Sequence, residues 1–248
     1  MLIRVHLRSS AAKASASVTT FTRSIESNHQ TLYLPNQIMN ESKDNGGSQG
    51  LDEKTADPDP LKQFQRWFDE ARAKVSQLPE AMTLATATTD GKPSARLVLL
   101  KQVDERGFVF YTNYRSSKAR DLEANPFAAL VFYWPQLERQ VRVEGTVTRT
   151  SAAESDKYFQ SRPRDSQIGA LASPQSEVIP NRDVLEQRLA ELEEEYRGRE
   201  VARPEHWGGY RLNPERIEFW KGRPGRLHDR FLYELQSDGS WVIKRLAP

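Results

Sequence analysis

Cationic side chains next to predicted turns, helix starts and strand ends are the residues of this chain best suited to chemistry. They are Arg96, Lys118, Arg162, Arg226 and Arg230. An arginine fork or a lysine ammonium is a natural partner of a phosphate dianion, although each of these residues alone is more often a solvated surface charge. The net charge of +2 argues against a nucleic-acid binder, which usually has a large basic excess. The local clusters of arginine still permit a small phosphorylated ligand.

The stretch from Ser94 to Lys101 carries two cations on one element. The apolar run Leu97-Val98-Leu99-Leu100 lies between Arg96 and Lys101. Turn-forming residues at 90–93 and 104–107 bound the stretch, which predicts a strand buried on both faces rather than a helix. At about 3.3 Å per residue the two cations lie roughly 16 Å apart, so the strand could hold a long anionic ligand. The alternative is a core strand with two ordinary rim charges.

Further motifs follow this strand. They are Phe108–Asn113, Ser116–Lys118, Glu138–Gly145, Tyr158–Pro163, Ser166–Gly169, Trp207–Tyr210, Arg226–Arg230 and the terminal Arg245–Pro248. In this order and at these distances the set resembles the pyridoxine/pyridoxamine 5′-phosphate oxidase family over roughly residues 57–248. No single motif is decisive, whereas the whole set is specific.

The resemblance implies a role for each matched position. FMN would contact Arg96, Leu97, Val98, Leu99, Leu100, Lys101, Tyr111, Thr112, Lys118, Gln140, Gln175, Ser176, Trp207 and Arg230. The substrate would contact Lys101, Tyr158, Arg162, Ser166, Arg226, Leu227 and His228. Arg96 and Lys118 would hold the FMN phosphate, and Arg162 the substrate phosphate. Arg226 and His228 would flank the substrate ring as the catalytic residues, and no metal is implied.

The implied reaction is oxidation of pyridoxine or pyridoxamine 5′-phosphate by oxygen, giving pyridoxal 5′-phosphate and hydrogen peroxide in vitamin B6 biosynthesis and salvage. FMN is the hydride acceptor, so the protein has to orient the substrate and stabilise negative charge on the flavin, for which Lys101 and Arg230 are suited. Two phosphate anchors would make the encounter an oriented step. Arg226 and His228 are expected on an extended segment, pointing to one face, where His228 could shuttle a proton or only orient the substrate.

Two departures from the family pattern stand out. The family usually has Ser-Arg-Lys where this chain has Ser116-Ser117-Lys118, so one phosphate-binding arginine is missing. Arg115, two positions before Ser117, could swing back to replace it, or could be solvated. The family also often has an Arg-rich segment ending in Tyr before the first helix, and residues 39–56 contain neither residue type. Closure of the site by such a segment is therefore in doubt.

The first 56 residues are expected to form a disordered extension. Residues 1–25 contain four basic residues and no acid, and are rich in Ser and Thr, which is compatible with an organelle transit peptide or with a plain tail. Residues 26–56 are polar, and we expect residues 1–50 to be dispensable for folding and turnover. The expected location is the cytoplasm, or a mitochondrion or plastid if the N-terminus is a transit peptide.

The folded domain, expected at residues 57–248, reads as many short strands with a few helices. Asp59 and Pro60 open a predicted helix whose apolar stripe runs from Leu61 to Val75. Shorter helices are predicted over about 116–124 and 152–160, and an amphipathic helix from about Leu185 to Gly198. Strands are predicted at 82–88, 94–101, 108–112, 128–134, 141–147, 207–212, 217–220, 230–235 and 241–245.

This list predicts a mainly β fold with flanking helices (α+β), in a barrel. The resemblance narrows the barrel to the FMN-binding split β-barrel, and implies a homodimer with its sites at the subunit interface. The chain has no cysteine, no metal-binding spacing among its four histidines and no apolar run of 18 residues, so we expect no disulfide, metal or membrane partner.

Two other functions remain open. One is a different split-barrel flavoprotein, such as a flavin or deazaflavin reductase, which should lack the Tyr158–Gly169 and Arg226–Arg230 motifs. The other is a non-catalytic carrier of flavin or pyridoxal phosphate, which the missing arginine and the missing closing segment leave open.

Overall fold

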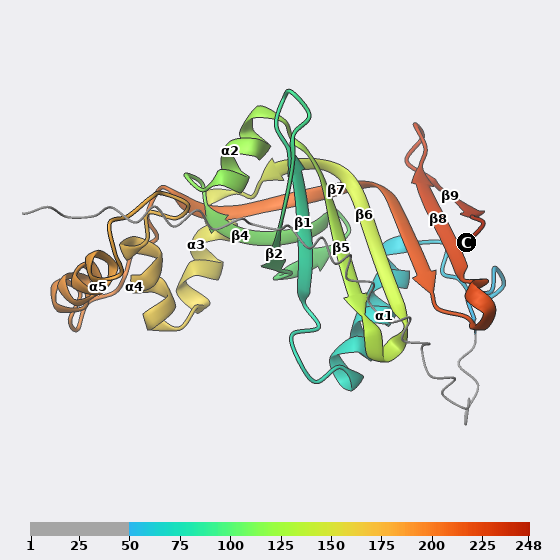
Figure 1. Cartoon of the computed structure of the whole chain (residues 1–248), viewed down its shortest axis with the longest axis horizontal. Coiled ribbons are helices and arrows are strands. Elements are labelled where there is room, and N and C mark those ends of the chain that lie inside the picture. The colour runs from blue at the N-terminus through green and yellow to red at the C-terminus, as the bar shows by residue number, and fades with distance from the viewer. Residues whose placement is uncertain (1–49) are drawn as a thin grey trace, which may run out of the picture. The chain divides into compact units, whose positions relative to one another are not determined.

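The computed structural model describes residues 50–248, which form one antiparallel sheet of nine strands with five α-helices around it (Figure 1). The strands are β1 Ala81–Ala87, β2 Pro93–Leu99, β3 Gln102–Asp104, β4 Gly107–Asn113, β5 Phe127–Trp134, β6 Arg139–Arg149, β7 Trp207–Lys221, β8 Asp229–Leu235 and β9 Trp241–Arg245. The helices are α1 Pro60–Lys74, α2 Ser117–Ala124, α3 Ala152–Ser161, α4 Arg164–Ala172 and α5 Asp183–Glu195, with 3-10 turns η1 Pro135–Leu137 and η2 Pro224–Arg226. The predicted mainly β fold with flanking helices is confirmed.

Strand β7 joins the two ends of the sheet. The strand order is β2-β1-β5-β6-β7-β4-β3, and β8 and β9 extend from β7. The first half of β7 pairs with β4 and the second half with β8, while β6 pairs along most of its length. Helices α3, α4 and α5 gather near the start of β7, and β8 and β9 lie at its far end (Figure 1).

The sequence predicted two strands where β7 is continuous, so that boundary was wrong. The chain passes through Pro214 without ending the strand because the register shifts between Glu144 and Gly145 of β6, opposite this point. A proline lacks the N–H of a regular ladder, and a bulge accommodates it. Gly145 permits the close approach, since a Cβ there would lie 2.0 Å from the Asn213 carbonyl oxygen.

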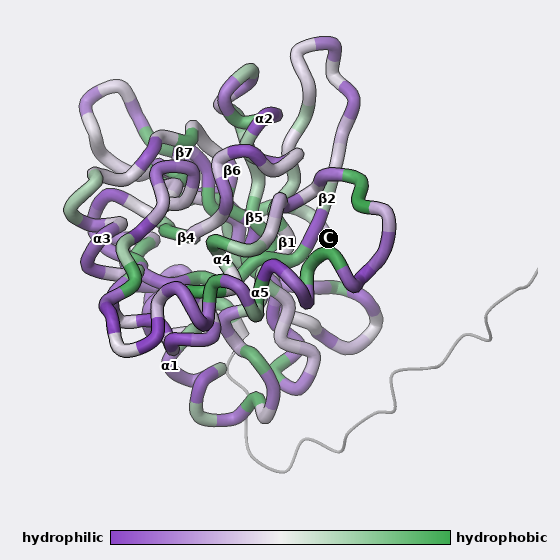
Figure 2. Tube along the Cα trace, turned by 90° about the vertical axis from the view of Figure 1, so that its left-hand side faces the viewer, coloured by the Kyte–Doolittle hydropathy of each residue, from purple (hydrophilic) through white to green (hydrophobic). Residues whose placement is uncertain are grey.

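The core lies between the sheet and α1, which begins as predicted. The Asp59 carboxylate accepts a hydrogen bond from the Leu61 N–H at 2.9 Å, and Pro60 takes the first helical position. The buried face of α1 presents Phe64, whose ring lies 4.8 Å from Phe108 and 4.9 Å from Phe132 between centroids. Hydrophobic stretches lie mostly in the central strands, and the outer turns are largely hydrophilic (Figure 2).

The expectation that β2 is buried on both faces is wrong for the single chain. Among the strands of residues 50–248, β2 is an edge strand that pairs with β1 alone, and Leu97 is 73% exposed. The chain then leaves the ladder at the buried Leu100 and continues into β3, so β4 returns antiparallel to β3 rather than to β2. An apolar, exposed edge is a surface that proteins normally cover.

Helix α4 was not predicted, although α3 and α5 were. Only Gln167 and Ile168 of α4 are buried, so its sequence carries no clear helical period. Ile168 packs in a second small core with Phe159 of α3, Leu192 of α5 and Trp207 of β7. This second core fixes α3 and α4 against the start of β7.

A buried arginine ties α3 to the sheet. Arg211 of β7 is 4% exposed, and its guanidinium contacts Asp104 of β3 and, at 3.0 Å, Glu154 of α3. The predicted capping box is present, because Glu154 accepts a hydrogen bond from the Ser151 N–H while the Ser151 hydroxyl accepts one from the Glu154 N–H. Hydrogen bonds from Ser151, and next from Arg106, lower the pKa of Glu154 to about 2.

The low pKa of Glu154 predicts a loss of stability in acid. Because the pKa of the folded state lies below the unfolded value of 4.5, the stabilisation is complete above pH 4.5 and is lost as the pH falls towards 2. Urea unfolding at pH 5 and pH 3 measures the free energy of unfolding at each pH. Between the two, the wild type should lose about 0.5–1 kcal/mol more of this free energy than Glu154→Gln, which is the usual contribution of a charged pair at the surface. Glu193→Gln, an exposed change on α5, should follow the wild type. Equal losses in wild type and Glu154→Gln would contradict this role.

Residues 50–56, which we expected in the disordered extension, contact the domain. Leu51 and Ala56 pack on the main core, and the Arg245 guanidinium donates to the Leu51 carbonyl at 2.9 Å and to the Glu53 carboxylate at 2.6 Å. The prediction of a disordered extension or transit peptide otherwise falls on residues 1–49, which lie outside the described residues. Within the described part of the chain, no helix is long and apolar enough to cross a membrane.

Two truncations test this boundary. A chain that begins at Gly50 should keep the melting temperature of the full chain, because the contacts of Leu51, Glu53 and Ala56 remain. A chain that begins at Asp57 should melt about 2–4 °C lower, the shift for a loss of about 1 kcal/mol of apolar burial in a chain of this size. Thermal unfolding followed by circular dichroism measures both. A large drop already at Gly50 would show that earlier residues stabilise the domain.

Candidate functional site

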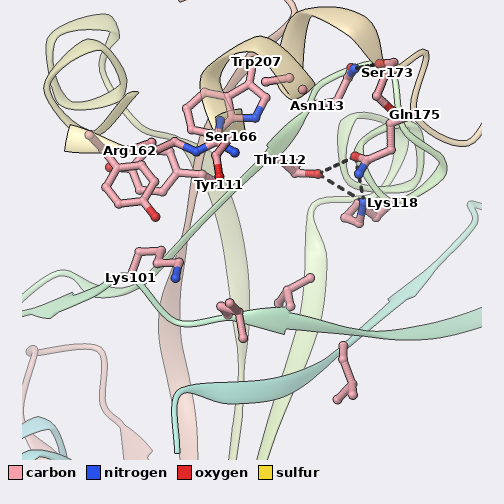
Figure 3. Close-up of a pocket in the computed structure, with 16 residues that line it drawn as sticks. Lys101, Tyr111, Thr112, Asn113, Lys118, Arg162, Ser166, Ser173, Gln175 and Trp207 are labelled. Carbon is pink, nitrogen blue, oxygen red and sulfur yellow. Dashed lines mark hydrogen bonds between the residues drawn. The ribbon is translucent and has the colours of Figure 1, made fainter. Parts of the chain in front are cut away.

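A cavity of about 460 Å³ lies between β2, the end of β4, helices α3 and α4, and the start of β7 (Figure 3). Its lining contains many of the residues predicted from the sequence: Leu97, Val98, Leu99, Lys101, Tyr111, Thr112, Lys118, Tyr158, Arg162, Ser166, Gln175 and Trp207. The sequence reasoning missed Asn113, Gly169, Ala170 and Ser173, which also line it. Asn113 and Gly169 are the last residues of two of the motifs named above, so their place in those motifs could have identified them as site residues.

One part of the cavity is a polar cradle around Lys118. Its ammonium group donates to the Thr112 hydroxyl at 3.1 Å and to the side-chain amide oxygen of Gln175 at 3.3 Å (Figure 3). It also donates to the Ser116 hydroxyl at 3.3 Å. All three partners are neutral. Burial, and then the positive charge of Arg96, lower the pKa of Lys118. A bound dianion would relieve both effects, so the cradle fits a phosphate group such as that of FMN.

Arg96 lies behind this cradle rather than in the cavity lining. Its guanidinium donates to the Thr86 hydroxyl at 2.7 Å and to the Ser94 hydroxyl at 2.6 Å, and lies 3.5 Å from the Asp121 carboxylate. Asp121 also accepts a hydrogen bond from Thr86 at 2.6 Å. The strand β2, its neighbour β1 and helix α2 therefore fix Arg96 close enough to influence Lys118.

A second cationic region of the cavity is built on stacked aromatic rings. The rings of Tyr111 and Tyr158 lie 4.0 Å apart at an interplanar angle of 16°, and the Tyr111 and Trp207 rings lie 5.5 Å apart at 10°. The Arg162 guanidinium carbon lies 4.6 Å from the Trp207 ring centroid. The stack holds these side chains in one orientation, with the amphipathic tyrosines facing the cavity.

Arg162 has an unsatisfied buried nitrogen. Among the described residues, nothing accepts a hydrogen bond from its Nη1 atom, which is inaccessible to solvent. Burial lowers the pKa of Arg162. A buried cation without a counterion is costly, and an anionic ligand would remove that cost. The region around Arg162 and Ser166 therefore fits a second phosphate.

Several other predicted residues lie near the far end of β7. Gln140, Trp220 and Arg230 face one another across β6, β7 and β8, and Tyr133 of β5 continues the row. Trp207 and Trp220 are 13 residues apart on β7, up to about 43 Å along an extended strand. Neither Gln140 nor Arg230 lines the cavity that contains Trp207, so within one chain both lie outside that cavity.

The loop between β7 and β8 carries Arg226, Leu227 and His228. The expected extended segment is wrong, because Arg226 belongs to η2 and has a φ of 61°. The His228 ring lies 4.7 Å from the Trp220 ring, and its Nδ1 accepts a hydrogen bond from the Arg223 N–H at 3.1 Å. A neutral His228 therefore carries its proton on Nε2. Leu227 is 73% exposed.

The remaining predicted residues are held by other contacts. Arg230 donates to Glu218 at 2.8 Å and to the Ala247 carbonyl at 2.9 Å, and the bond to Glu218 raises its pKa. Leu100 lies in the core, where it anchors the end of the β2 segment. Ser176 is exposed outside the cavity lining, next to Gln175.

Comparisons with known proteins agree with this architecture. Residues 68–196 match the sequence model of the family described as pyridoxamine 5′-phosphate oxidase, and residues 207–248 match one described as the pyridoxine 5′-phosphate oxidase C-terminal dimerisation region. A pyridoxine/pyridoxamine 5′-phosphate oxidase from Cyanothece sp. is 60% identical over 200 residues, covering 81% of this chain and 93% of that protein. One from Rubrobacter xylanophilus is 63% identical over 199 residues, covering 80% and 91%.

Solved structures show the same fold. PhzG from Burkholderia lata, in complex with tetrahydrophenazine-1-carboxylic acid, superposes with a TM-score of 0.76 at 31% identity, covering 82% of this chain and 100% of that one. A pyridoxamine 5′-phosphate oxidase-related, FMN-binding protein from Nostoc punctiforme has a TM-score of 0.61 at 17% identity, covering 81% and 100%. The predicted split barrel is thereby confirmed, as is the predicted class of enzyme, an oxidoreductase. The chain belongs to the pyridoxine/pyridoxamine 5′-phosphate oxidase family.

Proposed function

We propose that this chain is an FMN-dependent oxidase that converts pyridoxine 5′-phosphate or pyridoxamine 5′-phosphate to pyridoxal 5′-phosphate and passes the electrons to oxygen, with release of hydrogen peroxide. The observation that carries the proposal is the pair of cationic regions in one cavity, around Lys118 and around Arg162. Neither cation has a carboxylate partner among the described residues, so the cavity suits two phosphorylated ligands at once. The family of the chain supports this reading.

The residues of the cavity divide the work between binding and orientation. Lys118 and Thr112, with Arg96 behind them, bind the FMN phosphate, and Arg162 with Tyr158 and Ser166 binds the substrate phosphate. FMN, when bound, supplies the hydride acceptor. Anchoring both partners by their phosphates converts the encounter into an oriented step, and the aromatic stack excludes water from it.

A second copy of the chain completes the site in this proposal. Gln140 and Arg230 lie on the same sheet face as Leu97 and Tyr133, two apolar side chains that are 73% and 51% exposed. Covering this face with a partner would bury them and bring the β7–β8 loop of one chain to the cavity of the other. The C-terminal dimerisation region that residues 207–248 match supports a homodimer.

In the assembled site, Arg226 and His228 of one copy would contact the substrate ring in the cavity of the other. The Arg223 N–H holds the His228 Nδ1 atom, so the Nε2–H group is the donor that is free to bind a substrate oxygen or nitrogen. Lys101, exposed at the cavity rim, would add positive charge beside the flavin. The relatives named above are bacterial, which supports a cytoplasmic location over import through a transit peptide.

Turnover of pyridoxine 5′-phosphate by the FMN-loaded protein, followed as peroxide release, tests the proposed function. A protein that binds FMN and releases no peroxide with either substrate would overturn it.

A further inference from the structure

The first turn of α2 carries more positive than negative charge. Arg120 lies there with Lys118, and Arg96 approaches from β2, whereas Asp121 is the carboxylate that pairs with Arg96, at 3.5 Å. In the part of the chain that the structure describes, Arg120 has no carboxylate within ion-pair distance. Such a surplus of cations around one helix start favours an anion at that place.

The Arg120 side chain folds back over this turn. Its Nη1 donates to the Arg115 carbonyl at 2.6 Å, and its Nη2 donates to the Ser117 hydroxyl at 3.1 Å. Residues three apart on a helix share a face, so a guanidinium from position 120 can occupy the space beside position 117. A guanidinium has five N–H donors, and these two contacts leave others for a ligand.

The N-terminus of α2 is open to a ligand. The N-cap Ser116 is buried, and its side chain makes no capping hydrogen bond and instead accepts one from Lys118 at 3.3 Å. The first N–H groups of a helix without such a cap need an acceptor, and a phosphate is well suited to that place. The cradle of Lys118 and Thr112 described above lies next to this turn.

Arg115, the other arginine near this turn, lines a different cavity. This cavity has a volume of about 370 Å³ and is also lined by Glu177, Arg188 and His206. The backbone of Arg115 is fixed, because its N–H donates to Asn113 at 2.8 Å and its carbonyl accepts from Arg120. The expectation that Arg115 swings back to the phosphate stays a prediction, and the affinity measurements below test it beside Arg120.

We propose that Arg120 is a phosphate-binding residue of the FMN site. From a position three residues later on the helix, its guanidinium takes the place of the arginine that the family usually has at position 117. The proposal rests on the proposed function, in that the phosphate is that of FMN. Ser117 then serves to orient Arg120 through its hydroxyl. In this proposal Arg120 contacts only the phosphate, which riboflavin lacks. Removing its charge should therefore lower the affinity for FMN and not the affinity for riboflavin.

The test is the affinity for FMN and for riboflavin, measured with the full chain by quenching of flavin fluorescence. Arg120→Gln removes the charge but keeps a hydrogen-bond donor. It should weaken FMN binding about 4- to 12-fold and leave riboflavin binding unchanged, because a neutral hydrogen bond is about half as strong as a charged one. Arg120→Lys should keep part of the affinity. Adding Ser117→Arg to Arg120→Gln should restore most of it.

Arg115→Ala is the matched control and should change neither affinity more than about twofold, within the usual effect of an exposed charge. Equal FMN affinities for wild type and Arg120→Gln would overturn the role of Arg120 while leaving the proposed function intact. A parallel loss for FMN and riboflavin would show a structural effect of the variant and would also overturn it. A wild-type protein that binds neither flavin would refute both the proposed function and this inference.

Discussion

Replacing Arg162 with alanine should lower kcat/KM for pyridoxine 5′-phosphate about 10- to 150-fold and leave FMN bound. The expected loss is that of one charged hydrogen bond, about 1.5–3 kcal/mol. The physical reason is the buried Nη1 atom of Arg162, which has no partner among the described residues and lies in the cavity lining next to the Trp207 ring. Steady-state kinetics and the flavin content of the purified variant measure the two effects.

Arg182→Ala is the matched control, because that side chain is exposed and pairs with Glu186 at 2.5 Å on α5. It should keep the kinetics of the wild type. An Arg162→Ala variant with unchanged kcat/KM would reject the second phosphate site. A variant that loses FMN in proportion to its activity would place Arg162 at the cofactor instead of the substrate.

A heterodimer of two inactive variants should recover activity. In the proposed assembly, each site takes Arg162 from one chain and Arg226 from the other. A dimer of one Arg162→Ala chain and one Arg226→Ala chain therefore contains one site with both arginines intact and one site with neither. Its rate should be about half that of the wild-type dimer, although each homodimer is deficient.

Two affinity tags allow the heterodimer to be isolated after co-expression. The control is a heterodimer of one Arg162→Ala chain and one Lys118→Ala chain. Both residues line the cavity of their own chain, so each of the two cavities carries one substitution and no intact site can form. That pair should stay deficient in both sites. If the first heterodimer shows no recovery, Arg162 and Arg226 act within one chain, although Arg226 lies outside the lining of the cavity that contains Arg162.

The sequence predicted the fold well where local signals agreed with packing. Helix α1 begins at the expected proline, and the capping box of α3 is present. The errors arose where tertiary pairing overrides local pattern. An apolar run such as Leu97–Leu100 has the same composition in a central strand and in an edge strand. Strand β7 continues through Pro214 because its pairing with β6 shifts register there, which leaves Glu215 of β7 without a partner on β6.

The candidate site was predicted as a list of residues, not as a geometry. The motifs around Lys118 and Arg162 come together in one cavity, which spacing along the chain could not show. Spacing along the chain also did not show that Arg226, His228 and Arg230 lie outside the lining of that cavity in the same chain, because this depends on how β7 and β8 are placed. Arg120 was missed because its role depends on a side chain that folds back over a helical turn.

The most direct test of the proposed oxidase is a single turnover experiment with the purified, FMN-loaded protein. Without oxygen, adding pyridoxine 5′-phosphate should bleach the visible flavin absorption and form one pyridoxal 5′-phosphate for each flavin reduced. Admitting air should then restore the colour and release one hydrogen peroxide for each reduced flavin. A reductase of another substrate would keep its colour under these conditions, and so would a carrier. Persistent yellow colour with bound pyridoxine 5′-phosphate would contradict the proposal.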